Sequence, residues 1–273
     1  MTPYAVSEYM SRFVARHFGA PGRAWLTGLP GVIERCAAEW DLLIEDGLEG
    51  GLLSCVMSAR TGCGDAVVLK IGGPWTPIDR EACALAHWAG GPAPSLLKID
   101  QRLGALLLER ITPGSTASEH PAEEVAALLR ALHAVGPSAR QRASLPSLAD
   151  LVEERIATAG DEAFARSPAE AESLAPTLGR VRAEADALLT SFKDDPVLLH
   201  GDLEPRNILQ CAQRGIVAID PIPCVGDPAY DVAYWAIEGS PDGLEDRIAT
   251  LATCALLDRE RIERWATVIA LER

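Results

Sequence analysis

The sequence has no surplus of positive charge. Lysine and arginine number 25 against 39 aspartates and glutamates, giving a formal net charge of −14 at pH 7. A protein that binds nucleic acid needs a surface rich in lysine and arginine, so this balance argues against a nucleic-acid partner. An acidic cleft would instead concentrate a cationic small molecule. Solubility alone also accounts for an acidic composition, and the charge leaves both interpretations open.

Long apolar runs are also absent. No run approaches the roughly 20 residues that a membrane-spanning helix requires. The first residues, MTPYA, are not a basic region followed by an apolar stretch, which a secretory signal requires. At 273 residues and 48% hydrophobic residues, the chain can still build a sizeable core. We therefore expect a globular cytoplasmic protein that has no membrane partner.

The cysteines form no Cys-x-x-Cys pair. They are seven in number and scattered, at positions 36, 55, 63, 83, 211, 224 and 254. A disulfide framework and a zinc site both need recognisable spacings, so the sequence predicts neither. Most of these cysteines are expected to be small buried hydrophobic residues.

The most informative stretch of the chain is residues 197–221. It reads VLLHGDLEPRNILQ from position 197 and GIVAIDP from position 215. The apolar start predicts a buried strand, and the following HGD turns out of it, so Asp202 is expected at the edge of a core. Pro205 prevents a helix in the loop because proline lacks a backbone donor and disfavours a helical residue before it.

Two short strands of a hairpin are predicted next, at residues 208–209 and 216–219. Asn207 begins the first strand and Asp220 ends the second, so both side chains can converge near Asp202. Oxygen ligands of this kind suit Mg²⁺, which takes one or two protein carboxylates beside substrate phosphates. An Asp followed five residues later by Asn, with a further Asp downstream, is the spacing of the base and metal ligands in protein kinases. The pattern predicts metal-assisted phosphoryl transfer.

These motifs resemble those of the aminoglycoside phosphotransferases and their small-molecule kinase relatives. The resemblance rests on HGDLEPRN at residues 200–207 and on VGDPAYD at residues 225–231. Within that family, IDPIPCVGDP at residues 219–228 and AWLTGLP at residues 24–30 are most similar to the streptomycin 6-kinase and aminoglycoside/hydroxyurea resistance kinase branch. The resemblance covers most of the chain. It implies an α+β, bilobal, protein-kinase-like fold, with a five-stranded antiparallel sheet and a helix in the N-terminal lobe and a mainly helical C-terminal lobe.

The resemblance also implies roles for individual residues. Asp202 would orient the acceptor hydroxyl and accept its proton, while Asn207 and Asp220 would hold Mg²⁺. ATP or GTP would lie between the lobes. Asp231 would steady the catalytic loop through its backbone, although it is also placed to be a helix N-cap. His200 is expected to organise the loop rather than to act as a base, because Asp202 already fills that role.

The N-terminal lobe is expected to span residues 1–110. A helical pattern with Tyr9, Phe13, Val14 and Phe18 near one face precedes a break at residues 19–22 and a second apolar segment at residues 25–33. A helix is predicted over residues 79–89. Strands are predicted at residues 40–44, 52–59, 66–71, 96–99 and 103–108.

Lys70 lies in an otherwise apolar predicted strand and needs a counter-charge nearby. In the kinase template a strand lysine binds the nucleotide phosphates and pairs with a glutamate of the next helix, which here would be Glu81. A lysine that extends from an edge strand into water is the alternative. Gly47, Gly50 and Gly51 would let a backbone approach the phosphates, with Ser54 just beyond, but a plain hairpin turn would look the same.

The lobe boundary is predicted at residues 106–114, where an apolar strand meets Pro113-Gly114. By resemblance, the main chain of Glu109 to Ile111 would hydrogen-bond the nucleotide base. A strand end that leads into a linker explains the same residues.

The second lobe, residues 111–273, is expected to be mostly helical. His133 is expected to be a packed or capping histidine, not a catalyst. Pro176 is expected to break the helix that contains it. The helices are predicted at residues 122–135, 148–159, 168–192, 231–239, 244–257 and 258–271.

The acceptor is the least determined part of the function. Streptomycin is favoured by the branch resemblance and by the acidic balance, with Glu204, Trp235 and Glu238 as candidate contacts. Many relatives carry His where this chain has Glu204, and Arg206 is also unusual, which puts the usual substrate in doubt. A metabolic kinase for choline, an amino acid or a sugar is the alternative; a catalytically silent binding protein is disfavoured by the intact motif. The protein could be a monomer or a homodimer.

Overall fold

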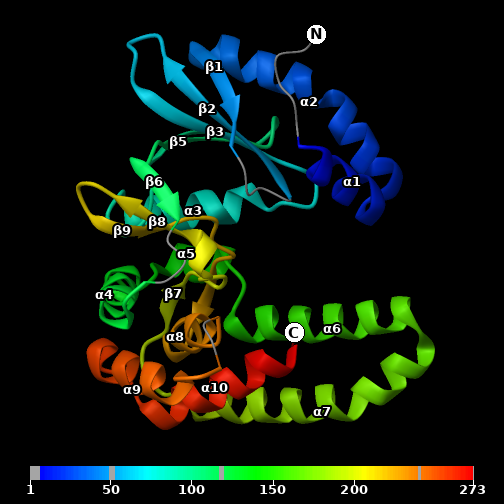
Figure 1. Ribbon diagram of the computed structural model, residues 1–273, viewed down its shortest axis with the longest axis vertical. Helices are drawn as coiled ribbons and strands as arrows, with labels where there is room; N and C mark the ends of the chain where they lie inside the picture. The colour runs from blue at the N-terminus through cyan, green and yellow to red at the C-terminus, as the bar shows by residue number, and fades with distance from the viewer. Residues whose placement is uncertain (1–6, 49–52, 117–119, 239–240, 273) are drawn as a thin grey trace. The chain divides into compact units, whose positions relative to one another are not determined.

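A computed structural model describes residues 7–48, 53–116, 120–238 and 241–272 (Figure 1). The chain divides into two compact units, one made of Met1–Gly90 with Pro94–Thr112 and the other of Gly91–Ala93 with Pro113–Arg273. Each unit is described separately below. The predicted α+β class is confirmed, because the first unit contains an antiparallel sheet with helices and the second is mainly helical.

The first unit is built on a five-stranded antiparallel sheet in the order β1-β2-β3-β5-β4. Apolar residues fill most of the central strands β3 and β5, whose side chains are largely buried. The strands are β1 (Leu42–Gly47), β2 (Ser54–Thr61), β3 (Ala66–Gly72), β4 (Leu96–Asp100) and β5 (Ala105–Glu109). The helices are α1 (Glu8–His17), α2 (Gly19–Trp40) and α3 (Ile78–Trp88).

Helices α1 and α2 form a core with the sheet. Met10 and Val14 of α1 and Leu29 and Ile33 of α2 are buried in one cluster with residues of β2, β3 and β5. The predicted apolar face of the first helix is therefore partly wrong, since Tyr9 is 69% exposed.

Two predicted boundaries in this unit are also wrong. Residues 19–22 are not a break but the first turn of α2, which runs on to Trp40. The first strand begins at Leu42 instead of residue 40, because Asp41 adopts a left-handed conformation (φ 55°) that ends the helix. The two residues assigned to the strand are thus the last turn and the cap of α2.

The second unit consists of seven α-helices and short strands among its described residues. Strands β6, β8 and β9 form one small sheet and β7 pairs with β10 in another. The helices are α4 (Ala122–His133), α5 (Ala139–Ser144), α6 (Leu148–Arg166), α7 (Pro168–Ser191), α8 (Ala229–Ala236), α9 (Leu244–Ala255) and α10 (Arg259–Glu272). The strands are β6 (Pro113–Thr116), β7 (Val197–Leu199), β8 (Ile208–Cys211), β9 (Gly215–Ala218) and β10 (Cys224–Gly226).

Pro176 does not break its helix as predicted. Helix α7 continues through it to Ser191 and buries Leu178, Val181 and Leu188 beyond it. Figure 1 shows α6 and α7 lying alongside each other over most of their length. Pro176 removes one backbone hydrogen bond from α7. The apolar surface that α7 buries against α6 offsets the free energy lost with that bond.

Three other expectations for the second unit are corrected. Pro113-Gly114 is not a break but the start of β6, which pairs with β8 through Pro113 and Cys211. Helix α6 extends to Arg166, beyond the predicted residue 159. Helix α4 ends at His133, before the predicted residue 135, and Val135 beyond it is 62% exposed.

In the described part of the chain, none of the helices combines the length and the apolar character that crossing a membrane requires. All seven cysteines are free thiols, and four of them, at positions 36, 55, 211 and 224, are buried.

Candidate active site

The loop that carries Asp202 leaves the core at the end of β7. This strand pairs with β10 through Leu199 and Cys224, and both residues are fully buried. Gly201 then adopts φ +77°, and a Cβ there would lie 2.0 Å from the carbonyl oxygen of Ile222. Glycine is therefore required at this turn, because a side chain would be both strained and in collision. The HGD sequence thus turns out of the core where it was expected to.

Asp231, at the start of α8, holds this loop through hydrogen bonds to its backbone. Its Oδ2 accepts the backbone N–H of His200 at 2.7 Å, and its Oδ1 accepts that of Gly201 at 2.9 Å. The Nε2 of His133 lies 2.9 Å from the same Oδ2. The predicted role of Asp231 in holding the loop backbone is confirmed, and His133 is a packed histidine that contacts this anchor.

His200 organises the loop through both of its ring nitrogens. Its ring is fully buried; Nε2 donates to the carbonyl oxygen of Ile219 at 2.9 Å, and Nδ1 accepts the N–H of Asp202 at 3.3 Å. Burial lowers the pKa of His200, despite the opposing effect of Asp231 and Asp202. The neutral ring joins the loop to the strand end that precedes Asp220.

The Asp231 anchor also makes stability depend on pH. Burial acts to raise the pKa of Asp231, but the His133 contact and the Gly201 N–H lower it, and the net pKa lies below its usual value. A carboxylate whose folded pKa is depressed adds stability above its unfolded pKa of about 3.9, and this is lost as the pH falls through the folded value.

We expect Asp231→Asn to lower the free energy of unfolding by about 2–5 kcal/mol at pH 7, because two buried N–H donors lose a charged acceptor. The difference in unfolding free energy between wild type and variant should narrow as the pH falls below about 4, because the unfolded wild-type chain then takes up a proton at Asp231 while the folded carboxylate is still ionised. Urea denaturation of both proteins from pH 7 to pH 3 measures this. A gap that does not change with pH would contradict the ionised anchor.

The carboxylate of Asp202 is held at both oxygens. The hydroxyl of Tyr234 donates to Oδ1 at 2.7 Å, and the amide nitrogen of Asn207 donates to Oδ2 at 3.1 Å. Arg155 of α6 donates through Nη2 to the carbonyl oxygen of Gly201 at 2.7 Å and lies 3.4 Å from Oδ1. The Asp202 side chain is only 18% exposed, so this carboxylate is fixed at the rim of the core.

Asn207 and Asp220 are placed by the hairpin of β8 and β9. Ile208 pairs with Ala218, and the N–H of Ile219 donates to the carbonyl oxygen of Asn207 at 2.8 Å. The predicted hairpin is therefore confirmed, with Asn207 in the 3₁₀ turn η1 (Pro205–Asn207) immediately before it. Asp220 has φ +56°, a strained value for a residue with a side chain.

These residues fit the needs of a magnesium ion. The amide nitrogen of Asn207 faces two oxygens of Asp202, the backbone oxygen at 2.8 Å and Oδ2 at 3.1 Å, and this orientation turns its amide oxygen away from Asp202. An amide oxygen and the carboxylate of Asp220 are hard donors, and Mg²⁺ typically takes few protein ligands beside water and phosphate.

In the first unit, Lys70 of β3 and Glu81 of α3 form the predicted pair. Lys70 Nζ donates to Glu81 Oε1 at 2.8 Å, and the two side chains are 7% and 6% exposed. The alternative of an edge-strand lysine reaching into water is wrong, because β3 is central and the ammonium is buried. An ion pair this deeply buried is costly to desolvate and serves stability poorly, which favours a functional role.

The other nucleotide-binding candidates of this unit are less clearly marked. Ser54 begins β2 opposite Gly72 and is 5% exposed, and Ile111 is 4% exposed. The N–H of Glu109 donates to the carbonyl oxygen of Ser95 at 3.0 Å, so it is engaged inside the sheet. Gly47 ends β1, whereas Gly50 and Gly51 lie outside the described residues.

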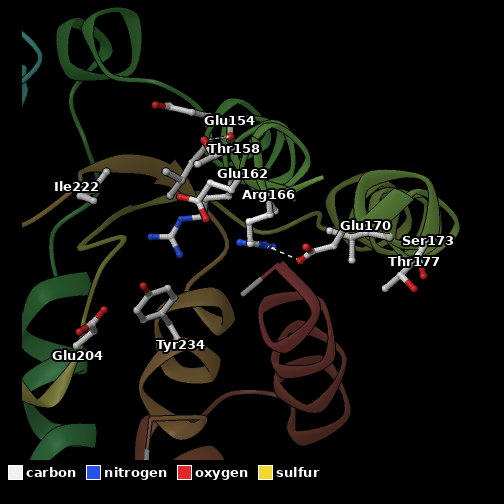
Figure 2. A pocket seen from close by; sticks show the side chains of 14 residues that line it. Glu154, Thr158, Glu162, Arg166, Glu170, Ser173, Thr177, Glu204, Ile222 and Tyr234 are labelled. Carbon is white, nitrogen blue, oxygen red and sulfur yellow. Dashed lines mark hydrogen bonds and ion pairs between the residues drawn. The ribbon is translucent and has the colours of Figure 1, made fainter. Parts of the chain in front are cut away.

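A pocket of about 760 Å³ opens in the second unit beside Asp202. Arg155 and Tyr234, which both contact Asp202, are among its lining residues. Figure 2 shows Glu154 and Glu162 on one side, along α6, and Tyr234 with Glu204 on the other. The pocket is therefore large enough for a small molecule and adjoins the candidate base.

Comparison with known proteins decides the family. A model of the aminoglycoside/hydroxyurea antibiotic resistance kinases matches residues 40–272. The chain belongs to this family. It is 30% identical to a streptomycin 6-kinase of Streptomyces griseus over 98% of this chain and 89% of the relative. It is 29% identical to a hydroxyurea phosphotransferase of Kitasatospora aureofaciens over 92% of this chain and 73% of the relative.

The kinase-like fold has counterparts among solved structures. A choline/ethanolamine kinase family protein of Mesorhizobium loti has a TM-score of 0.61 with this chain, at 18% identity, over 88% of this chain and 83% of that one. This likeness supports the fold only. Together with the family, it confirms the predicted bilobal kinase-like class and makes the chain a phosphotransferase that acts on a hydroxyl group with a nucleotide as phosphate donor.

The three acceptor contacts predicted from the sequence are placed differently in this resistance kinase. Glu204 lines the pocket, and its N–H donates to the carbonyl oxygen of Asp202 at 2.9 Å. Trp235 and Glu238 are not among the lining residues. Every residue of α8 is buried, and of the two neighbours Tyr234 and Trp235 it is Tyr234 that lines the pocket.

The sequence analysis missed Arg155 and Tyr234, which contact Asp202 from helices α6 and α8. Tyr234 follows Asp231 by three residues, which places both on one face of α8, so its position relative to the loop anchor was a usable signal. Arg155 carries no such signal. It lies in a stretch of α6 rich in charged residues, and only the tertiary structure brings it to Asp202.

Proposed function

We propose that this chain transfers the γ-phosphate of ATP or GTP to a hydroxyl group of streptomycin or a closely similar cationic aminoglycoside, with Mg²⁺ as cofactor, and so confers resistance. The single observation that carries the proposal is the fixed carboxylate of Asp202 beside a pocket of about 760 Å³ that has acidic side chains in its wall. The 30% identity to a streptomycin 6-kinase supports the choice of acceptor.

Asp202 provides the base of the reaction. It accepts the proton of the acceptor hydroxyl as the hydroxyl oxygen bonds to the γ-phosphorus, and the bond from that phosphorus to the β–γ bridging oxygen breaks to release the nucleoside diphosphate. Catalysis of this kind depends mainly on positioning and on neutralising charge. The hydrogen bonds from Tyr234 and Asn207 supply the positioning, because they hold both carboxylate oxygens.

Charge neutralisation is assigned to residues of both units. The ammonium of Lys70, kept in place by Glu81 at 2.8 Å, would bind the nucleotide phosphates. Asn207 and Asp220 would hold Mg²⁺, which neutralises phosphate charge when bound. Ser54 would contact the phosphates, and main-chain groups of residues 109–111 other than the engaged N–H of Glu109 would bind the base.

The charge of the pocket favours a cationic acceptor. Arg166 compensates Glu170, with the guanidinium Nε 2.5 Å from the carboxylate, and Arg206 pairs with Glu204 at 2.7 Å. Within the described residues, Glu154 and Glu162 form no ion pair with a basic side chain. Two uncompensated carboxylates on one wall attract a ligand that carries guanidinium or ammonium groups.

We expect Glu162→Gln to raise the KM for streptomycin roughly 10-fold or more while kcat stays within about threefold, because a charged hydrogen bond to bound acceptor is lost in ground and transition states alike. Steady-state kinetics at saturating ATP measures this. Glu172→Gln is the matched control, since Glu172 is an exposed α7 glutamate that does not line the pocket. An unchanged KM in both variants would remove Glu162 from the acceptor site.

A coupled assay of nucleoside diphosphate release tests the proposed function. The purified protein with Mg²⁺ and either ATP or GTP is offered streptomycin, other aminoglycosides, hydroxyurea, choline, amino acids and simple sugars. Turnover that depends on streptomycin supports the proposal, and the ATP and GTP arms identify the donor. Turnover only with choline, an amino acid or a sugar overturns the acceptor and assigns the chain to metabolism.

A further inference from the structure

We propose that Arg155 and Tyr234 are positioning residues of the phosphoryl transfer, which act by fixing the carboxylate of Asp202 toward the acceptor pocket. The inference rests on the proposed role of Asp202 as the base. Both residues come from helices outside the catalytic loop, α6 and α8, and both meet the carboxylate at the same oxygen, Oδ1.

Tyr234 sets the rotation of the carboxylate. Its hydroxyl lies 2.7 Å from Oδ1, while the amide of Asn207 lies 3.1 Å from Oδ2, so the plane of the carboxylate is held from both ends. Tyr234 itself has little freedom, because it is 3% exposed and sits on the buried helix α8. Asp231, one turn earlier on this helix, binds the loop backbone. One face of α8 therefore positions both the loop and its reactive group.

Arg155 holds the loop and Tyr234 together. Its Nη2 donates to the carbonyl oxygen of Gly201 at 2.7 Å and lies 3.4 Å from Oδ1 of Asp202. The guanidinium carbon is 4.6 Å from the centre of the Tyr234 ring, close enough for a cation–π contact. Burial acts to lower the pKa of Arg155, but Tyr230, Tyr234 and Asp202 raise it, and the net pKa lies above its usual value.

The location of this pair argues for a role in the reaction. Arg155 and Tyr234 line the acceptor pocket as well as contacting Asp202. The planar guanidinium can serve the Gly201 carbonyl, the carboxylate and the tyrosine ring together, which the single ammonium of a lysine cannot do.

The test compares Tyr234→Phe, Arg155→Lys and Arg155→Met, each alone and in an Asp202→Ala background. In the wild-type background we expect Tyr234→Phe and Arg155→Met to lower kcat roughly 10- to 100-fold, with acceptor KM and nucleotide Kd within about threefold. Arg155→Lys should lie between Arg155→Met and wild type. In the Asp202→Ala background no further loss is expected, since the two residues act through Asp202.

A purely structural role would give a different pattern. The melting temperature of each variant is compared with that of Arg182→Met, which removes an exposed ion pair between α6 and α7 that has no contact with the pocket. Losses of equal size in both backgrounds, or a raised KM with unchanged kcat, would overturn the proposal. Should Arg155→Met fail to fold, Tyr234→Phe decides, because it removes one oxygen and keeps the ring against the guanidinium.

Failure of this inference is separable from failure of the proposed function. The kinetic comparison uses whichever member of the acceptor panel the wild-type protein phosphorylates. If streptomycin is not a substrate, the positioning roles of Arg155 and Tyr234 can still be tested with another acceptor. If no panel member is phosphorylated, the same variants are compared in nucleotide hydrolysis, where water replaces the acceptor hydroxyl at Asp202. Unchanged rates in the variants overturn the positioning roles, whatever the acceptor proves to be.

Discussion

Asp202→Ala should lower the rate of phosphoryl transfer roughly 10²- to 10⁴-fold, the contribution typical of a positioned general base. Nucleotide affinity should fall far less than the transfer rate, because Asp202 acts on the acceptor and Asn207 keeps its hydrogen bond to the backbone oxygen of residue 202. The measurement is single-turnover transfer to streptomycin together with equilibrium binding of ATP in the presence of Mg²⁺.

Two further variants serve as controls for this experiment. Asp202→Asn keeps the shape of the side chain and the acceptor for the Tyr234 hydroxyl, so a loss as large as that of the alanine variant assigns the effect to the lost charge. Asp186→Ala removes an exposed carboxylate from α7 and should leave transfer unchanged. Substantial transfer by both Asp202 variants would contradict the assignment of the base.

Asp220→Ala should abolish the Mg²⁺-dependent part of nucleotide binding. The loss should exceed the roughly 10- to 100-fold that removal of an outer-shell partner costs a metal site. Asp220 and Asn207 are the two proposed metal ligands, and the hairpin that places them is joined by the 2.8 Å hydrogen bond from the Ile219 N–H to the carbonyl oxygen of Asn207. Titration of ATP into wild type and variant, with Mg²⁺ and with a chelator, measures the effect.

The backbone at this position calls for a second variant. Asp220 has φ +56°, a conformation that asparagine tolerates better than alanine, so Asp220→Asn removes the charge with less strain. Wild type and both variants should bind ATP equally once metal is removed. Equal affinity in the presence of Mg²⁺ would show that Asp220 is not a metal ligand.

The catalytic hairpin was predictable because its signals are local. A buried strand, a glycine turn, a proline and two short apolar runs specify the path from Val197 to Asp220, and the structure follows it. Lys70 was predictable for a related reason. A charge within an apolar strand demands a partner, and Glu81 on the next helix supplies it at 2.8 Å.

The errors come from elements whose outcome depends on tertiary contacts. Pro176 is a helix breaker by local rules, yet the packing of α7 along α6 keeps the helix continuous. Arg155 is one of many charged residues on α6, and only folding selects it to meet Asp202. Tyr234 lines the pocket in place of the predicted Trp235, because the sequence does not distinguish which side of a fully buried helix faces a pocket.

The roles of Ser54, Glu109 and Ile111 in nucleotide binding remain predictions. Their positions in the first unit follow from the strands that contain or precede them, which the sequence located to within a few residues. The groups that would touch a nucleotide are mostly backbone atoms, however. Backbone contacts leave little trace in side-chain chemistry, so the sequence could supply only the resemblance.

The burial of Asp231 has a consequence for how the protein loses activity. Its carboxylate holds the amides of His200 and Gly201 inside the core formed around α8, where both N–H groups are shielded from water. Amides of this kind exchange their hydrogens only in the largest opening events of a protein, so the loop belongs to its most cooperative unit of folding. Heat or denaturant should therefore not yield a folded population with a disordered catalytic loop. Inactivation and unfolding of the second unit should coincide in a single transition.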